Sequence, residues 1–257
     1  MLYFKKILNS NSKEWCVFIH GAGGSSSIWH KQVKAYSENF NLLLIDLRGH
    51  GKSKDLKTSK NYSFEMIAQD VIEVVEFNKI PSAHFIGVSL GTIIIYQIFA
   101  LKPSIVKSMI FSGAITRLNI KSRLLLRIGR LLNPFLPYMT LYALLARIIM
   151  PKKNHKTSRI LFINEAKKLM TKEFNRWFKL TARLTTYLNL VEHESNNKPT
   201  IYIMGSEDHM FLEPVKAIVD LNPRIQLNVV PNCGHVVNIE QAEVFNAISI
   251  QFIRKSA

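Results

Sequence analysis

The sequence has few cysteines, few acidic residues and no long uninterrupted apolar run. Its two cysteines, Cys16 and Cys233, are too few for a disulfide framework, and we interpret both as buried thiols. The start of the chain lacks an apolar segment followed by a small-residue cleavage site, so we expect a cytoplasmic protein without a secretory leader. A long uncharged apolar stretch, 131–146, is interrupted by Asn133 and two prolines and is shorter than the roughly 20 residues of a spanning helix. A membrane-spanning protein is therefore not expected.

The shortage of acidic residues is concentrated in one segment. The chain has 34 Lys and Arg against 18 Asp and Glu, a formal net charge of +16. Residues 117–198 contain 17 of the basic residues and only four of the acidic ones, so most of the excess charge lies there. The hydrophobic share of 47% is ordinary for a globular domain, and 257 residues can form a single domain with a substantial core. This composition argues against a disordered or fibrous chain.

Short apolar runs alternate with helical patterns along both flanks of the sequence. A stretch at 62–77 is amphipathic, with Ser63 as its N-cap and Pro81 beyond its end. The stretch at 237–254 predicts a closing helix. The alternation predicts the α/β class, with a mostly parallel central sheet flanked by helices. The predicted strands are 15–19, 42–46, 84–88, 106–112, 201–204 and 226–230.

The strand pattern stops after residue 112 and resumes only at residue 200. Between them, Leu, Arg and Lys recur at helical spacing, and Pro134, Pro137 and Pro151 divide the segment into pieces. We therefore predict a helical insertion at 115–198.

The segment Gly87-Val88-Ser89-Leu90-Gly91 matches the pattern G-x-S-x-G. It follows an apolar run and precedes a helical run, which is the strand–turn–helix context that the motif requires. A serine at such a turn has a strained backbone, and the two glycines allow the helix and the neighbouring strand to approach. Its hydroxyl would lie at a helix N-terminus, where N–H groups favour developing negative charge. Ser89 is therefore the candidate nucleophile.

A nucleophilic serine needs a base, and a carboxylate that orients the base. His235 follows the last predicted strand and Asp208 follows the strand before it, so both belong at the edge of the sheet where the parallel strands end. We expect His235 to act as the base and Asp208 to orient it. Glu207 stays open as an alternative to Asp208, because either type of carboxylate can fill the role. The other histidines are interpreted as structural or solvated: His20, His30, His50, His84, His155, His193 and His209.

A glycine-rich segment, 20–25 (HGAGGS), follows the first predicted strand. A turn there can direct a main-chain N–H at an acyl oxygen, together with the N–H of the residue after the nucleophile. We therefore expect an oxyanion hole formed by the backbone N–H groups of Ala22 and Leu90. A phosphate cradle is the alternative, but the segment lacks both the P-loop ending and the spacing of a dinucleotide-binding turn.

These motifs together resemble the α/β-hydrolase superfamily, in particular its lid-bearing serine esterases and lipase-like members. The order serine, acid, base along the chain is the one found in that fold. Residues 46–53 (DLRGHGKS) are similar to the D-x-R-G-x-G-x-S turn of the family, which implies structural roles for Asp46 and His50. The resemblance implies a hydrolase core at 1–114 and 199–257, with a helical lid at 115–198.

The sequence departs from some branches of this family. Members that open epoxides or remove halide carry Asp at the nucleophile position, so Ser89 argues against those reactions. A second glycine after the motif is frequent in carbon–carbon bond hydrolases and perhydrolase-like members, whereas Thr92 stands there in this chain.

The start of the insertion has the pattern of a basic amphipathic helix. Arg123, Arg127 and Arg130 recur at helical spacing, and leucines and isoleucines fill another face. This pattern fits contact with an anionic membrane surface. It fits equally a lid whose apolar face covers the active site, or attraction of an anionic substrate. Nucleic acid is not expected as a partner, because no nucleic-acid-binding module accompanies the charge.

The sequence predicts a hydrolase that cleaves a small carboxylic ester with an apolar acyl or alcohol group through an acyl-enzyme. Neither a metal nor an organic cofactor is expected. A thioesterase, a lactonase or a carbon–carbon bond hydrolase would use the same three side chains, so these stay open as alternatives. A non-catalytic basic binding protein on the same scaffold is the alternative from another class.

Overall fold

The computed structural model describes residues 1–54, 56, 62–181, 183–184, 187–188, 197–222 and 224–256. His193, Glu192 and Glu194 of the predicted insertion lie outside these residues.

The described residues form a seven-stranded sheet in the order β1-β3-β2-β4-β5-β6-β7. Neighbouring strands are parallel except β1 and β3, which pair antiparallel. The predicted α/β class and all six predicted strands are confirmed, with ends shifted by one residue at most. The strands are β1 (Phe4–Ile7), β2 (Trp15–Ile19), β3 (Asn41–Ile45), β4 (Ala83–Val88), β5 (Val106–Ser112), β6 (Thr200–Gly205) and β7 (Ile225–Val230). β1 was not predicted, because this short edge strand carries two exposed lysines in place of an apolar run.

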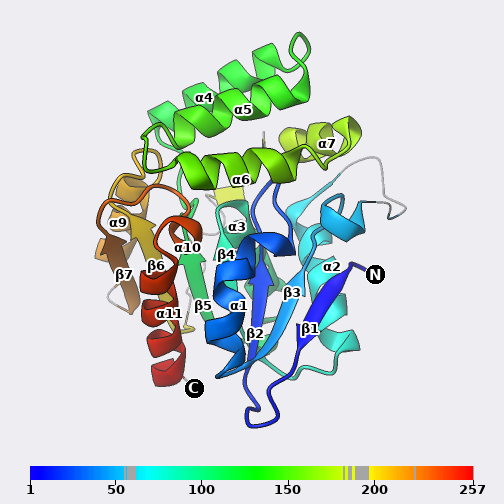
Figure 1. The fold of residues 1–257 in the computed structure, drawn as a ribbon, viewed down its shortest axis with the longest axis vertical. Helices are drawn as coiled ribbons and strands as arrows, with labels where there is room; N and C mark the ends of the chain where they lie inside the picture. The colour runs from blue at the N-terminus through cyan, green and yellow to red at the C-terminus, as the bar shows by residue number, and fades with distance from the viewer. Residues whose placement is uncertain are drawn as a thin grey trace.

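Two hydrophobic clusters pack on the two faces of the sheet. In β2, Val17 and Ile19 belong to one cluster, and Cys16 and Phe18 belong to the other, as the alternation of a strand requires. The first face is covered by α2 (Phe64–Phe77), α3 (Leu90–Leu101) and α9 (Leu212–Leu221). The second face is covered by α1 (His30–Ser37), α10 (Val237–Glu240) and α11 (Ala242–Ser256) (Figure 1). Short 3₁₀ turns lie at Ser26–Trp29, Gly51–Ser53 and Pro103–Ile105. Both cysteines are buried free thiols, as predicted.

Local signals agree with the helices except at the C-terminus. Ser63 Oγ accepts the N–H of Met66 and caps α2, as predicted. The predicted single closing helix is wrong, because Gln241 leaves the helical conformation and separates α10 from α11. The short α10 packs against α6, whereas α11 runs along β5 and β6. Both helices also pack against α1 and β6, so the break at Gln241 lies between two helices that cover the same face of the sheet.

The helical insertion lies between β5 and β6 and covers the edge where the parallel strands end (Figure 1). It contains α4 (Ile120–Leu132), α5 (Tyr138–Ile149), α6 (Lys156–Ala166) and α7 (Thr171–Thr181). Pro134, Pro137 and Pro151 fall between these helices, where the sequence predicted breaks. Across the described part of the chain, no helix combines the length and the apolar character needed to cross a bilayer.

Candidate active site

Ser89 lies at the sharp turn between β4 and α3. Its φ of 53° is in the left-handed region, which is strained for a residue other than glycine. Its N–H donates to the carbonyl of Ser112 at 3.0 Å and so anchors the turn to β5. A Cβ at Gly91 would lie 2.4 Å from the carbonyl oxygen of Ile19, so only glycine lets α3 start this close to β2. The turn therefore presents the Ser89 hydroxyl at the first turn of α3.

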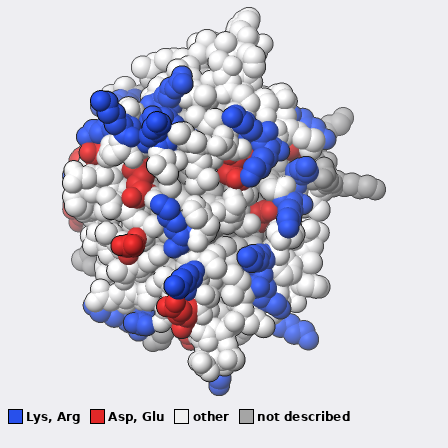
Figure 2. All heavy atoms as spheres, in the orientation of Figure 1, with Lys and Arg blue, Asp and Glu red and all other residues white. Residues whose placement is uncertain are grey.

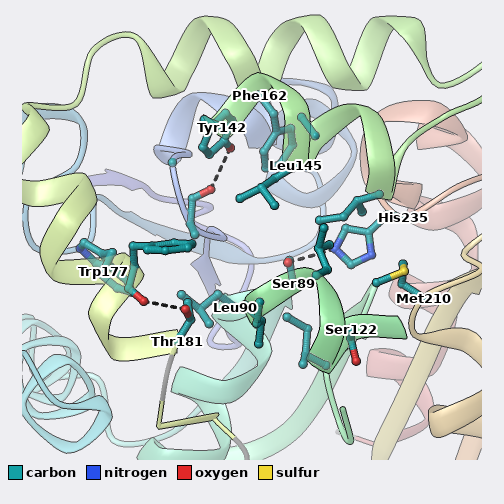
Figure 3. A pocket seen from close by; sticks show the side chains of 18 of the residues that line it. Ser89, Leu90, Ser122, Tyr142, Leu145, Phe162, Trp177, Thr181, Met210 and His235 are labelled. Atoms are coloured by element: carbon teal, nitrogen blue, oxygen red, sulfur yellow. Dashed lines mark hydrogen bonds between the residues drawn. The ribbon is translucent and has the colours of Figure 1, made fainter. Parts of the chain in front are cut away.

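The imidazole of His235 lies between Ser89 and Asp208. His235 Nε2 is 3.0 Å from Ser89 Oγ (Figure 3). His235 Nδ1 is 2.8 Å from Asp208 Oδ2. A carboxylate only accepts hydrogen bonds, so Nδ1 carries the proton and Nε2 is free to accept the serine hydroxyl. The Asp208 side chain is buried, and its Oδ1 accepts the N–H of Phe211. The structure thus joins three side chains from three separate loops in one hydrogen-bonded row.

Glu207, the alternative carboxylate, has other partners than His235. Its two oxygens accept hydrogen bonds from Lys152, Asn154 and His155, which follow α5. Hydrogen bonds from Asn154 and Lys152 lower the pKa of Glu207 to about 2. Glu207 therefore fastens the insertion to the loop that carries Asp208.

Two N–H groups of the glycine-rich segment are already paired inside the protein. Gly23 N–H donates to His50 Nε2 at 2.9 Å, and Gly24 N–H donates to the carbonyl of Gly21 at 3.1 Å. Among the described residues, the N–H groups of Ala22 and Leu90 have no such acceptor, and both residues line the cavity beside Ser89. Both are therefore available to an oxygen atom bound there.

Two buried histidines hold the segment in place. His20 and His50 each accept a main-chain N–H at Nε2, from Leu47 and Gly23, and each places Nδ1 against a main-chain carbonyl. This pattern requires the neutral ring, because a protonated Nε2 could not accept. Burial lowers the pKa of His20, and it lowers that of His50 still further, with the neighbouring His20 as a second cause. Sequence reasoning assigned His50 only a structural role and missed its hydrogen bond to the glycine-rich segment.

Asp46 has the structural role that the resemblance implied. Its carboxylate accepts the N–H groups of Ser26 and Lys52 and so closes the turn after β3. His84, in contrast, lies at the start of β4, far along the strand from Ser89, and its ring contacts Ser108 and Glu14.

Tyr142 of α5 is the clearest contact that the sequence did not indicate. Its hydroxyl donates to the carbonyl of Ala22 at 3.1 Å, and its ring lies over Gly23 (Figure 3). No local pattern marks this tyrosine, because its partner is 120 positions earlier in the chain.

The site opens into a cavity of about 200 Å³ between the sheet edge and the insertion. The described residues that line it include no Lys, Arg, Asp or Glu. Two polar lining groups are already paired, since Ser122 and Thr181 donate to main-chain carbonyls of their own helices. Besides Ala22 and Leu90, the apolar lining residues are Ile115, Leu118, Leu125, Leu126, Leu145, Ala146, Ile149, Met150, Phe162, Leu169, Phe174, Trp177, Phe178, Leu184, Met210, Phe211 and Val236. Within the described residues, no three His, Cys, Asp or Glu side chains gather as a metal site would require.

Comparison with known protein families finds a model that matches most of this chain. A family model described as alpha/beta hydrolase fold matches residues 15–242. A protein of Haemophilus influenzae whose name proposes an esterase/lipase is 24% identical over 261 residues, covering 93% of this chain and 83% of that protein.

Solved structures agree in fold. A hydrolase from Oleispira antarctica matches with a TM-score of 0.85 and 18% identity, covering 98% of this chain and 94% of that one. A thermophilic esterase from Thermogutta terrifontis matches with a TM-score of 0.80 and 17% identity, covering 99% and 93% of the two chains. Other similar proteins carry names that indicate a carbamate hydrolase, an enol-lactonase and a meta-cleavage product hydrolase. At these identities the structural likeness shows the fold alone.

Proposed function

The chain belongs to the alpha/beta hydrolase fold family, and we propose that it is a serine hydrolase that cleaves small, neutral, apolar carboxylic esters. The observation that carries the proposal is the row Ser89, His235 and Asp208, with separations of 3.0 and 2.8 Å. Two similar proteins are named as an esterase/lipase and as a thermophilic esterase, which supports the proposed ester substrate.

In the proposed reaction, Ser89 Oγ attacks the ester carbonyl while His235 Nε2 takes its proton. Asp208 keeps the imidazole in the required tautomer and stabilises the imidazolium. The N–H groups of Ala22 and Leu90 receive the negative charge that develops on the carbonyl oxygen. His235 then protonates the leaving alcohol, and a water molecule, deprotonated by the same imidazole, releases the acid from the acyl-enzyme.

The cavity lining supports the substrate class. An anionic group would enter it without a cationic partner among the described lining residues, and such burial is costly. Leucine, isoleucine and aromatic side chains instead match a hydrocarbon acyl or alcohol group. We propose accordingly that the insertion at 115–198 acts as a lid that supplies most of this wall.

Other reactions with the same machinery are supported less specifically. The enol-lactonase, carbamate hydrolase and meta-cleavage product hydrolase among the similar proteins indicate that this fold hosts several chemistries. No lining residue in the described part of the chain singles out a lactone, a thioester or a carbon–carbon bond. A non-catalytic binding protein would have no need of the strained Ser89 backbone or of the aligned imidazole.

The test is a series of p-nitrophenyl esters of increasing acyl length, with the hemisuccinate as an anionic partner for the butyrate. Wild-type protein should hydrolyse the neutral esters, and Ser89→Ala should lower kcat/KM by at least about 10³-fold. The hemisuccinate should be the poorer substrate of the matched pair. Undiminished hydrolysis by Ser89→Ala would contradict the mechanism, and a preference for the hemisuccinate would contradict the substrate class.

A further inference from the structure

The outer face of α4 carries a row of exposed apolar side chains. Ile120, Leu124, Ile128 and Leu131 are 83%, 55%, 43% and 72% exposed, and Phe135, just beyond the helix, is 82% exposed. Their spacing of four, four and three places the four helical residues on one face. Single exposed apolar residues are ordinary on a protein surface, but a continuous row indicates a surface that meets an apolar partner.

A row of arginines runs beside these apolar side chains. Arg123, Arg127 and Arg130 are exposed and follow the same helical repeat. Arg123 and Arg130 donate to main-chain carbonyls of their own segment, and no carboxylate of the described residues lies within ion-pair distance of the three. Their charge is therefore available to an anionic partner.

Packing inside the protein does not account for the outer row, because α4 uses a different face for that purpose. Leu125 and Leu126 line the cavity, and Gly129 is buried against Phe178. Sequence reasoning placed the apolar residues of this helix on one face. The structure divides them into an inner set that encloses the cavity and an outer set that faces solvent.

We propose that the outer face of α4, together with Phe135, docks on an anionic lipid surface. The apolar row would enter the boundary between headgroups and acyl chains, and the arginines would meet the lipid phosphates. Figure 1 places α4 at the outermost end of the molecule, so the helix can lie flat on a surface without obstruction by the sheet. On the face that Figure 2 shows, the upper end of the molecule, where the turn after α4 lies, has no charged side chains, and Lys and Arg side chains lie below it.

Other occupants fit this face less well. A second copy of the chain would bring two strongly basic insertions together, with 17 Lys and Arg against four Asp and Glu in each. A nucleic acid would pair with the arginines but leave the apolar row without a partner. Of these three occupants, the anionic lipid surface is the one that complements both rows.

The docking proposal extends the proposed function. Only its statement about substrate delivery rests on that function. Ile120, Leu124 and Ile128 would contact lipid while Leu125 and Leu126 of the same helix face the cavity. A single helix would then separate the membrane from the active site, and apolar esters dissolved in the lipid are the substrates it would reach. Docking itself does not require Ser89.

The test is co-sedimentation of the full chain, carrying Ser89→Ala to prevent lipid hydrolysis, with two kinds of vesicle. It should bind vesicles that contain phosphatidylglycerol and bind pure phosphatidylcholine far more weakly. Leu124→Asn with Ile128→Asn should weaken binding about tenfold or more. Arg123→Gln, Arg127→Gln and Arg130→Gln together should weaken it about 100-fold.

Matched control variants change the same chemistry elsewhere. Leu221→Asn with Val244→Asn removes exposed apolar side chains from α9 and α11, and Lys5→Gln, Lys6→Gln and Lys255→Gln together remove three charges. Neither control should weaken vesicle binding by more than about threefold, and this limit includes the small loss that a lower net charge causes in the lysine control.

Four results would overturn the proposal: no binding, equal binding to both vesicle types, equal effects of α4 and control variants, or a dimer that the α4 variants dissociate. With Ser89 restored, the α4 variants should hydrolyse soluble p-nitrophenyl butyrate like the wild type, because their substituted side chains do not line the cavity. If neither the wild type nor the α4 variants hydrolyse p-nitrophenyl butyrate, while the wild type still binds anionic vesicles, the result would contradict the proposed function and leave the docking proposal standing.

Discussion

The edge of the sheet and the insertion above it are built by different means. At the edge, Ser89, Asp208, Ala22 and His50 lie on short loops, and main-chain hydrogen bonds fix these loops to one another. The insertion contributes apolar walls, and it carries 17 basic residues against four acidic ones, whereas the rest of the chain has 17 against 14. The proposed chemistry thus lies on the loops at the edge, and we propose that the insertion selects the substrate and the docking surface.

Polar contacts join the two regions at two places. One is Glu207, which accepts from Lys152, Asn154 and His155 of the insertion. At the other, Tyr142 donates to the carbonyl of Ala22, Trp177 Nε1 donates to the carbonyl of Arg48, and Ser25 donates to Glu165. These last three contacts end on or beside the glycine-rich segment and the turn after β3. Substitutions at the edge should therefore affect turnover most, and substitutions at the contacts should affect it less.

The largest expected effect separates two neighbouring carboxylates. Asp208→Asn should lower kcat by about 10⁴-fold, because an amide no longer favours the tautomer with the proton on Nδ1. Glu207→Gln should change kcat only a few-fold, because its partners are Lys152, Asn154 and His155. Steady-state kinetics with p-nitrophenyl butyrate distinguishes them. Equal losses of kcat in the two variants would contradict the assignment of Asp208 to catalysis and of Glu207 to the attachment of the insertion.

The next effect tests whether His50 positions the glycine-rich segment. His50→Leu removes the acceptor of Gly23 N–H, so the neighbouring N–H of Ala22 should move and kcat should fall by about 10- to 100-fold with little change in KM. His84→Leu removes an equally buried imidazole at the other end of β4 and should leave kcat within about threefold. Thermal unfolding of both variants checks that they are folded. A drop of the same size in His84→Leu would contradict the positioning role.

A smaller effect concerns stability and pH. The pKa values of His20 and His50 are lowered in the folded protein by burial, so below about pH 6.5 the unfolded chain binds protons that the native chain does not. The stability that these neutral rings supply is present above that pH and is lost as the pH falls below it. The slope is at most about 1.4 kcal/mol per pH unit for each histidine.

Urea unfolding between pH 7.5 and 5.5 measures this slope. His50→Gln should have a flatter profile than the wild type. A profile unchanged by that substitution would mean that His50 does not remain neutral in the native state.

The smallest expected effect tests the hydrogen bond from Tyr142 of the insertion to Ala22 at the edge. Tyr142→Phe removes the hydrogen bond to Ala22, and because one such bond is worth about 1 kcal/mol, kcat/KM should fall about fivefold. Tyr138→Phe removes a similar bond within the insertion, to the carbonyl of Leu169, and should leave kcat/KM within about twofold. Equal changes in the two variants would show that the bond to Ala22 has no special influence on the edge.

The sequence predicted much of the fold and of the site, and its errors have physical reasons. Strands β2 and β5 were predicted to the residue, because both contain the β-branched and aromatic residues that favour strands. β1 was missed because an edge strand tolerates lysines, and the break at Gln241 was missed because the direction of α10 depends on α6. Ser89, Asp208 and His235 were selected from the motif and from their positions after strands, and the structure brings these side chains together.

The α/β class, the position of the insertion and the turn that exposes Ser89 could be predicted from the amino-acid sequence, because each depends on the period and turn residues of a short segment. The folded chain was needed to show which carboxylate contacts His235, which N–H groups are left available beside Ser89, and which leucines of α4 enclose the cavity. These depend on segments far apart in the chain that meet only after folding, such as Tyr142 and Ala22. No local pattern encodes such a meeting.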